Sequence, residues 1–206
     1  KNIGELLSNA AGILIPGGFG NRGISGKIEA IRYARENQIP FLGICLGMQL
    51  SIIEFTKNVL KMKNSGSSEF GKHTNNVISL MTEWSKKNQK VKRTKENDLG
   101  ATMRLGSYPC YIKEKSLASK VYKKKLIHER HRHRYEVNPK YRSLIEKKGL
   151  VFSGFSKDKK LLEIIENKNH KWFLGVQFHP ELKSKPFKPH PIFFSFIKNS
   201  LINKNA

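Results

Sequence analysis

Cys45 has the clearest potential for chemistry in this sequence, because it lies in the run GICLG at residues 43–47. The run has the form of a nucleophile elbow, a sharp turn from a strand into a helix, with cysteine where many hydrolases have serine. Its two glycines suit a nucleophile on a strained backbone, since the neighbours of such a residue must be small. The N-terminus of the following helix would favour the thiolate, the reactive form of cysteine. Taken alone, the run is equally compatible with a cysteine that is buried for packing.

A nucleophilic thiol needs a base that accepts its proton and a group that orients this base. The downstream run QFHPE at residues 177–181 offers both in His179 and Glu181. His179 follows an apolar segment, so it should lie at the end of a strand, where parallel sheets place their active sites. Glu181 could reach back to the imidazole, because Pro180 fixes the turn between them. A surface histidine beside a carboxylate is the ordinary alternative, but together with the elbow these residues predict a Cys-His-Glu triad.

The glycine-rich run PGGFG at residues 16–20 follows another short apolar segment. A turn of this kind exposes backbone N–H groups, which can stabilise an oxyanion that develops during acyl transfer. Phosphate binding is the alternative, but the run lacks the Lys-Ser/Thr that ends a P-loop and the glycine spacing of a dinucleotide site. An oxyanion hole is therefore the favoured interpretation.

The elements that must position these runs alternate regularly in the first part of the chain. Apolar strands at residues 12–15 and 40–44 are each followed by a helix, at residues 25–37 and 46–56, in which apolar residues recur at helical spacing. Strand, helix, strand, helix in this order is typical of a parallel α/β sheet with right-handed crossovers. The start of the chain therefore predicts an α/β fold.

Beyond residue 57 the sequence is more polar and then richer in strand patterns. Polar loops are predicted at residues 64–70 and 73–98, the second interrupted by a short strand at residues 77–80. Later strands and a closing helix are predicted at residues 103–105, 109–112, 131–137, 150–155, 161–166, 173–178 and 191–201. Neither an internal repeat nor a linker divides the chain, so one domain over residues 1–206 is predicted.

The net charge of +23, from 39 basic and 16 acidic residues, raises the possibility of a nucleic-acid partner. The lysines form short clusters along the whole chain, without interleaved aromatics or the spacing of a known DNA-binding motif. Solvated faces are therefore favoured, with no nucleic-acid partner. The alternative is a basic nucleic-acid-binding protein in which Cys45 is structural.

The location of the protein follows from what the sequence lacks. No apolar run reaches the length of a membrane span, and the first residues do not have the pattern of a signal peptide. Two cysteines in a chain of this length do not indicate a disulfide framework. We therefore expect a cytoplasmic protein without a membrane partner.

A metal site is the other reading of the histidine-rich run around His128, His131 and His133. The last two would share one face of a strand, as metal ligands require. Arginines alternate with these histidines on the opposite face, however, and no nearby cysteine completes a ligand set. No metal site is predicted.

Taken together, the glycine loop, the cysteine elbow and the His-Pro-Glu run resemble the class I glutamine amidotransferases. Within that class, the sequence is similar to the amidotransferase domain of the CTP synthase family. The motifs that carry this resemblance span most of the chain: PGGFGNRG at 16–23, GICLGMQ at 43–49, NSGSSEF at 64–70, GATMRLG at 100–106, ERHRHRYEVN at 129–138 and GVQFHPE at 175–181. The resemblance implies a flavodoxin-like fold with a mostly parallel central sheet, flanking helices and a small additional antiparallel sheet.

The resemblance also implies a reaction. Cys45 would attack the side-chain amide of glutamine and form a thioester with release of ammonia. His179 would protonate the ammonia and then activate water, with Glu181 orienting its ring. The backbone N–H groups of Gly18 and Leu46 would hold the oxyanion. The glutamine-binding residues implied are Gly18, Phe19, Leu46, Gln49, Glu69, Arg134 and Tyr135.

The charges of glutamine fit two of these implied residues. Its α-ammonium group needs a carboxylate such as Glu69, and its α-carboxylate needs a guanidinium such as that of Arg134. Spacing alone does not decide whether Arg132 or Arg134 contacts the substrate.

The same resemblance implies a larger enzyme around this domain. An N-terminal synthetase domain of the same polypeptide would use the ammonia for ATP- and Mg²⁺-dependent amination of UTP to CTP, with GTP as activator and a tetramer as the assembly. We expect this chain to lack that domain, a first strand and helix, and any cofactor of its own. The alternatives are another class I amidotransferase or a γ-glutamyl hydrolase, which would use the same triad.

Overall fold

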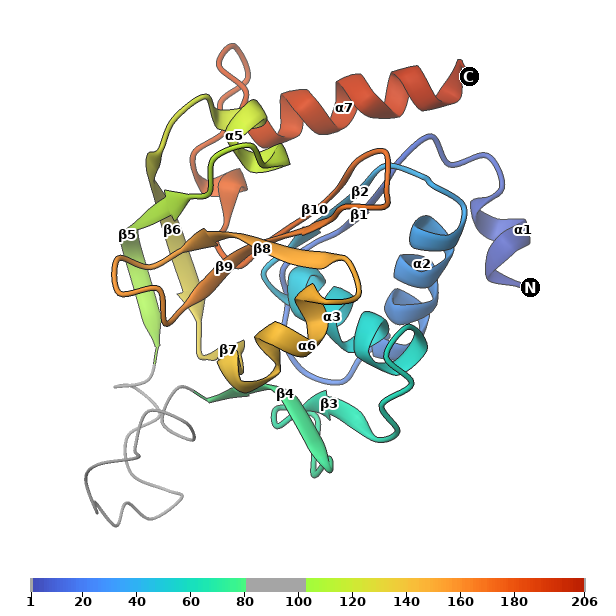
Figure 1. Cartoon of the computed structure of the whole chain (residues 1–206). Helices are drawn as coiled ribbons and strands as arrows, with labels where there is room; N and C mark the ends of the chain where they lie inside the picture. Colours follow the sequence, from blue (N-terminus) through green and yellow to red (C-terminus); the bar gives the residue numbers. More distant parts are fainter. Residues whose placement is uncertain (1, 81–102, 206) are drawn as a thin grey trace.

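The computed structural model describes residues 2–80 and 103–205, and its main feature is a curled seven-stranded sheet (Figure 1). In spatial order its strands are β1 Ile13–Ile15, β2 Phe41–Ile44, β10 Phe173–Val176, β9 Leu162–Asn167, β8 Leu150–Phe155, β5 Arg104–Ile112 and β6 Leu126–His133. A second sheet consists of β3 Ser65–Ser67, β4 Asn75–Leu80 and β7 Tyr135–Val137. Because β6 ends at His133 and β7 begins at Tyr135, the chain passes from one sheet to the other at Arg134.

Helices cover both faces of the large sheet. They are α1 Ile3–Leu7, α2 Ile24–Glu36, α3 Leu46–Asn58, α5 Leu117–Tyr122, α6 Arg142–Glu146 and α7 Pro191–Lys204, with 3-10 turns η2 Pro139–Tyr141 and η3 Pro180–Leu182. Figure 1 shows α5 and α7 on one side of the sheet and α2 and α3 on the other. Successive strand residues point to opposite faces. Phe41 therefore belongs to the core beneath α2 and α3, and Leu42 to the core beneath α5 and α7.

The α/β fold predicted from the sequence is confirmed, but the expectation of a mostly parallel sheet is wrong. Only the pairs β1–β2 and β2–β10 are parallel, and the remaining four pairs of this sheet are antiparallel. The physical reason lies in the connections. Parallel neighbours usually need a long crossover, whereas β8, β9 and β10 follow one another through short turns that favour antiparallel pairing. The small sheet is likewise mixed, since β3 and β4 are parallel.

α3 is the central helix of the domain. Every residue from Leu46 to Thr56 is buried, so the helix has no solvated face before its last turn. It packs against α2 and lies beneath strands β1, β2 and β10. Because Cys45 immediately precedes α3, a helix buried within the core sets the position of this residue.

The strands and helices expected in the first part of the chain are confirmed as β1, α2, β2 and α3. The segments expected at 103–105 and 109–112 form one strand, β5, whereas the segment at 131–137 divides between β6 and β7. The short elements β3, α5 and α6 were not expected. Most of the polar loop predicted at 73–98, and the first three residues of the GATMRLG motif, lie outside the described residues.

Across residues 2–80 and 103–205, none of the helices combines the length and the apolar character that crossing a bilayer requires.

The burial of α3 gives a direct test of the fold. Leu50 is fully buried in the core beneath the sheet, whereas Leu201 on α7 is 57% exposed. Leu50→Ala should lower the free energy of unfolding by about 2–5 kcal/mol, because it removes buried methyl groups and leaves a cavity. The matched change Leu201→Ala should alter it by less than about 0.5 kcal/mol. Urea denaturation of both variants measures the difference, and equal effects would contradict the central position of α3.

Candidate active site

Cys45 lies on the sharp turn between β2 and α3, with a left-handed backbone at φ 49° and ψ −100°. This conformation is strained for a residue with a side chain. Its backbone N–H donates to the carbonyl oxygen of Val176 at 2.7 Å, which ties the turn to β10. A Cβ atom on Gly47 would lie 2.2 Å from the carbonyl oxygen of Ile15, and one on Gly43 would lie 2.7 Å from the carbonyl carbon of Gly47. Both flanking positions therefore require glycine.

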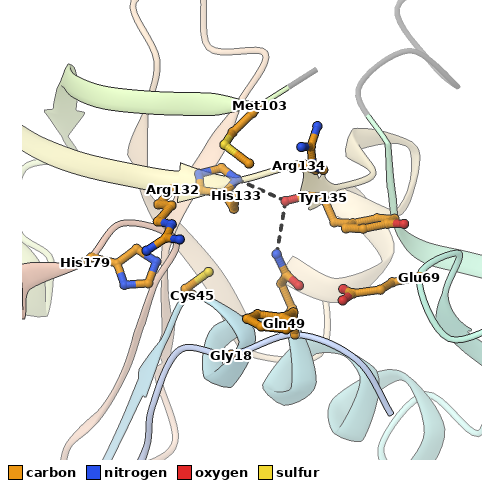
Figure 2. Close-up of a pocket in the computed structure, with 11 residues that line it drawn as sticks. Gly18, Cys45, Gln49, Glu69, Met103, Arg132, His133, Arg134, Tyr135 and His179 are labelled. Atoms are coloured by element: carbon orange, nitrogen blue, oxygen red, sulfur yellow. Dashed lines mark hydrogen bonds between the residues drawn. The ribbon is translucent and has the colours of Figure 1, made fainter. Parts of the chain in front are cut away.

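His179 follows β10, and its ring lies beside Cys45 in Figure 2. Its Nδ1 atom is 2.6 Å from Oε1 of Glu181, which lies in the turn η3. The nearby Cys45 sulfur and the hydrogen-bonded Glu181 carboxylate raise the pKa of His179 to about 10. The backbone N–H of His179 donates to the carbonyl oxygen of Arg130 at 2.8 Å, so the histidine is also attached to β6. The three residues of the predicted triad are thus brought together.

The glycine loop packs directly against this histidine. A Cβ atom on Gly17 would lie 2.7 Å from Cε1 of His179 and 3.6 Å from Cβ of Cys45. At Gly18 it would lie 3.3 Å from the side chain of Leu46. The loop can approach the nucleophile this closely only because these positions lack side chains.

A cavity of about 410 Å³ opens over Cys45 (Figure 2). It is lined by Gly18, Phe19, Cys45, Gln49, Glu69, Met103, Arg132, His133, Arg134, Tyr135 and His179. Of the triad, oxyanion-hole and glutamine-binding residues expected from the sequence, Leu46 and Glu181 lie outside this lining. Leu46 is buried as the first residue of α3, and Glu181 contacts the ring of His179. The cavity therefore brings together Cys45, His179 and the implied glutamine-binding residues other than Leu46.

Sequence reasoning missed two lining residues, Met103 and His133. The motif that contains Met103 was recognised, but nothing in it indicated which residue faces the site. His133 could have been found from alternation, because it ends the strand that carries Arg132 and precedes Arg134. His133 was passed over because the histidines of this strand were considered only as metal ligands.

Arg132 and Arg134 differ in their surroundings. Arg132 is exposed on β6, and Figure 2 shows its guanidinium beside His179. Arg134 lies at the junction of the two sheets and is half-buried. Its Nη1 atom is buried and has no hydrogen-bond partner among the described residues. A buried guanidinium donor without a partner is costly, so this atom has the stronger need for an anionic ligand.

Glu69 and Phe19 also line the cavity. The Oε1 atom of Glu69 accepts a hydrogen bond from the backbone N–H of Gly20 at 2.9 Å, which holds the glycine loop against the segment after β3. Phe19, in the same loop, is 90% exposed. The cavity lining thus contains a carboxylate as well as two guanidinium groups.

A buried polar network supports the wall that carries the two arginines. Arg104 donates to Glu136 at 3.2 Å and to Glu163 at 2.8 Å, and His131 Nδ1 lies 2.8 Å from His133 Nε2. Burial lowers the pKa of His131 to about 2 and that of His133 to about 3, so both rings are neutral at physiological pH. Burial raises the pKa of Glu136 to about 7. These histidines thus act as packed, uncharged supports of the wall.

Metal binding was not predicted for the histidine-rich strand. Within the part of the chain that the structure describes, no group of three or more histidine, cysteine, aspartate or glutamate residues is arranged to hold a metal ion.

Comparison with known proteins places this geometry in a family. The family model "Glutamine amidotransferase class-I" matches residues 1–199. CTP synthase of Pelagibacter ubique is 62% identical over 198 residues, which are 96% of this chain and 37% of that protein. CTP synthase of Aquifex aeolicus is 56% identical over 201 residues, 97% of this chain and 36% of that protein. A solved structure of the Trypanosoma brucei CTPS glutaminase domain with bound acivicin is 39% identical with a TM-score of 0.85, covering 96% of this chain and 73% of that one.

The chain therefore belongs to the class-I glutamine amidotransferase family. Among the members of this family, it is a glutaminase domain of the CTP synthase type, as its sequence relatives and its structural relative both indicate. It spans little more than a third of the length of the CTP synthases that it matches.

The raised pKa of His179 predicts a specific pH dependence. Glu181→Gln should lower the pKa of His179, because it removes a carboxylate that stabilises the charged ring. The pKa of His179 in the folded protein, about 10, exceeds the ordinary histidine pKa of 6.5. The interaction therefore stabilises the fold fully below pH 6.5 and is lost as the pH rises towards 10. Titration of the histidine ring resonances by NMR measures the pKa, and urea denaturation at pH 6 and pH 10 measures the stability.

His170 serves as the internal control for that titration, because Glu181 does not affect its pKa. Burial lowers the pKa of His170, and its ring contacts the backbone of Ala34 and Trp172. Its resonance should titrate identically in both proteins. An unchanged pKa of His179 in the variant would show that Glu181 does not orient or charge this ring.

Proposed function

We propose that this chain hydrolyses L-glutamine to glutamate and ammonia, with Cys45 as the nucleophile. One observation carries the proposal. Cys45, on a strained turn, faces a cavity that also contains a histidine paired with a carboxylate at 2.6 Å. This arrangement supplies a nucleophile, a base and an orienting group, which are the parts that acyl transfer requires.

The proposed reaction begins with the thiolate of Cys45. Because the pKa of His179 is raised to about 10, the imidazole carries its proton at neutral pH and the proton is available for the leaving group. The sulfur attacks the carboxamide carbon of glutamine, and the negative charge that develops on oxygen is held by the backbone N–H groups of Gly18 and Leu46. His179 gives its proton to the departing ammonia and leaves a thioester on Cys45. Water, deprotonated by the now neutral His179, releases glutamate.

Recognition of glutamine would use a carboxylate and a guanidinium of the cavity lining together, because the α-ammonium and α-carboxylate groups of glutamine are attached to the same carbon atom. Glu69 is suited to the α-ammonium group, and the partnerless Nη1 of Arg134 to the α-carboxylate. Gln49 is already a donor to the backbone carbonyl of Tyr135 at 3.0 Å and to Gln177 at 3.2 Å. Both of its N–H groups are therefore used, so only its oxygen remains for the ligand. The side-chain oxygen of Gln49 is therefore an acceptor suited to the α-ammonium group of glutamine.

We further propose that the ammonia serves the amination of UTP to CTP in a longer cytoplasmic polypeptide. The relatives that support this are named CTP synthase, and the chain covers 36–37% of their length. The remainder would include an N-terminal synthetase domain that uses ATP and Mg²⁺, with GTP as activator and a tetrameric assembly. None of the steps derived above for Cys45 and His179 involves these groups.

The function is tested by Cys45→Ala in the full-length polypeptide. Glutamine-dependent CTP formation should fall by at least about a thousandfold, because the nucleophile is lost. CTP formation from added ammonium should remain, since it bypasses this site. Cys110→Ala is the matched control, because Cys110 is the other cysteine and is buried outside the cavity. Loss of both activities with Cys45→Ala, in a protein that folds normally, would make Cys45 structural and refute the proposal.

The choice between the two arginines is tested by glutamine kinetics. Arg134→Ala should raise the KM for glutamine about tenfold or more, because a charged hydrogen bond to the buried Nη1 is worth about 1.5–3 kcal/mol. Arg132→Ala should raise it by less than about threefold, since the exposed Arg132 is better solvated. Steady-state glutaminase assays give both values. The reverse order would assign the substrate carboxylate to Arg132.

A further inference from the structure

Gln177 lies two residues before His179 and is completely buried. Its side-chain Nε2 is 3.7 Å from Sγ of Cys45, within hydrogen-bonding range for sulfur. It does not line the cavity, so the substrate does not reach it there. Its backbone N–H donates to the carbonyl oxygen of Glu163 at 2.9 Å, which fixes the main chain at this position. The side chain therefore contacts the nucleophile from the protein side and not from the substrate side.

The orientation of this carboxamide is set by a chain of hydrogen bonds. The carbonyl oxygen of Tyr135 can only accept, so the atom of Gln49 that lies 3.0 Å from it must be the nitrogen. That nitrogen also lies 3.2 Å from the Gln177 side chain, where it meets an oxygen and donates its second N–H. The other end of the Gln177 carboxamide is then the nitrogen, and this nitrogen faces the sulfur. A backbone carbonyl thus determines which end of Gln177 meets Cys45.

We propose that Gln177 is a positioning residue, whose N–H holds the sulfur of Cys45 and stabilises its thiolate, and that Gln49 keeps this N–H in place. The inference rests on the proposed function, in which Cys45 attacks as the thiolate. A hydrogen bond to an ionised acceptor is roughly twice as strong as one between neutral groups, so the N–H favours the thiolate over the thiol. The positive charge that stabilises the thiolate comes from His179, and the side-chain N–H of Gln177 adds an uncharged hydrogen-bond donor to the same sulfur.

Two substitutions separate this role from simple packing. In Gln177→Glu, the carboxylate still accepts from Gln49, so the internal hydrogen bond survives, but a negative acceptor replaces the donor to sulfur. In Gln177→Met, the size is similar, the donor is lost without added charge, and Gln49 keeps its hydrogen bond to Tyr135 but loses the one to residue 177. A structural role predicts that glutamate is tolerated better than methionine. A positioning role predicts the opposite order in the reactivity of Cys45.

The measurement is the rate of alkylation by iodoacetamide between pH 5 and pH 9, with the modified cysteine identified by peptide mass spectrometry. This rate follows the thiolate fraction, because the thiolate is the nucleophile. At pH 7 we expect Gln177→Glu to react about tenfold more slowly than the parent protein and Gln177→Met about threefold more slowly, with both profiles moved to higher pH. In glutaminase assays, kcat should fall in both variants while KM changes less than twofold, since Gln177 is outside the cavity lining.

Cys110 is the control for folding within the same sample. It is fully buried, and burial raises the pKa of its thiol, so it reacts only if the core opens. If Cys110 becomes reactive in Gln177→Glu, that variant has lost its fold and Gln177→Met decides. The inference is overturned if Cys45 of Gln177→Met is alkylated at the parent rate while Cys110 stays unreactive. It is also overturned if Cys45 of a folded Gln177→Glu protein is alkylated as fast as in the parent.

Failure of the proposed function would look different. A parent protein whose Cys45 is alkylated but which releases no ammonia from glutamine would refute glutamine hydrolysis. The order of alkylation rates would still decide the role of Gln177, because iodoacetamide requires only the thiolate.

Discussion

The strained backbone of Cys45 is the feature on which the rest of the site depends. A left-handed residue at the end of a strand is unfavourable and persists only where its surroundings hold it. Here β1, β2 and β10 converge on it. Ile15 leaves no room for a side chain at Gly47, and Val176 accepts the N–H of Cys45 at 2.7 Å. The fully buried α3 then prevents the turn from relaxing on its other side. The parallel part of the sheet, although small, is therefore the part that presents the nucleophile.

The antiparallel part of the sheet has a different task, since it carries the wall with Arg132, His133 and Arg134. The residues packed behind this wall must hold the two arginines in place without adding a further positive charge beside them. The neutral pair His131 and His133 provides packing, while Arg104 is matched by two buried carboxylates. A protonated histidine at either position would place a further positive charge behind the arginines and weaken their electrostatic balance. The parallel half of the sheet thus sets the position of the Cys45 thiol, and the antiparallel half sets the position of the arginines that line the cavity.

Much of this arrangement could be predicted from the sequence, and the limits have physical causes. The elbow at Cys45 and the His179–Glu181 pair are local patterns whose spacing alone constrains geometry. The direction of β8 and β9 is not local, because apolar runs pair in either direction and only the connection length decides. The cavity position of Met103 and His133 depends on where β5 and β6 end, which propensity does not determine. The sequence does not separate Arg132 from Arg134, since both have the same chemistry, and their difference in burial becomes visible only in the structure.

The hydrogen bond between the N–H of His179 and the carbonyl oxygen of Arg130 has a mechanical consequence. It connects the loop that carries the base to the strand that leads, four residues later, to Arg134. A shift of this strand along the sheet would therefore move the backbone of His179 and that of Arg134 in the same direction. The distance between the imidazole and this guanidinium is thus set by one strand and one hydrogen bond.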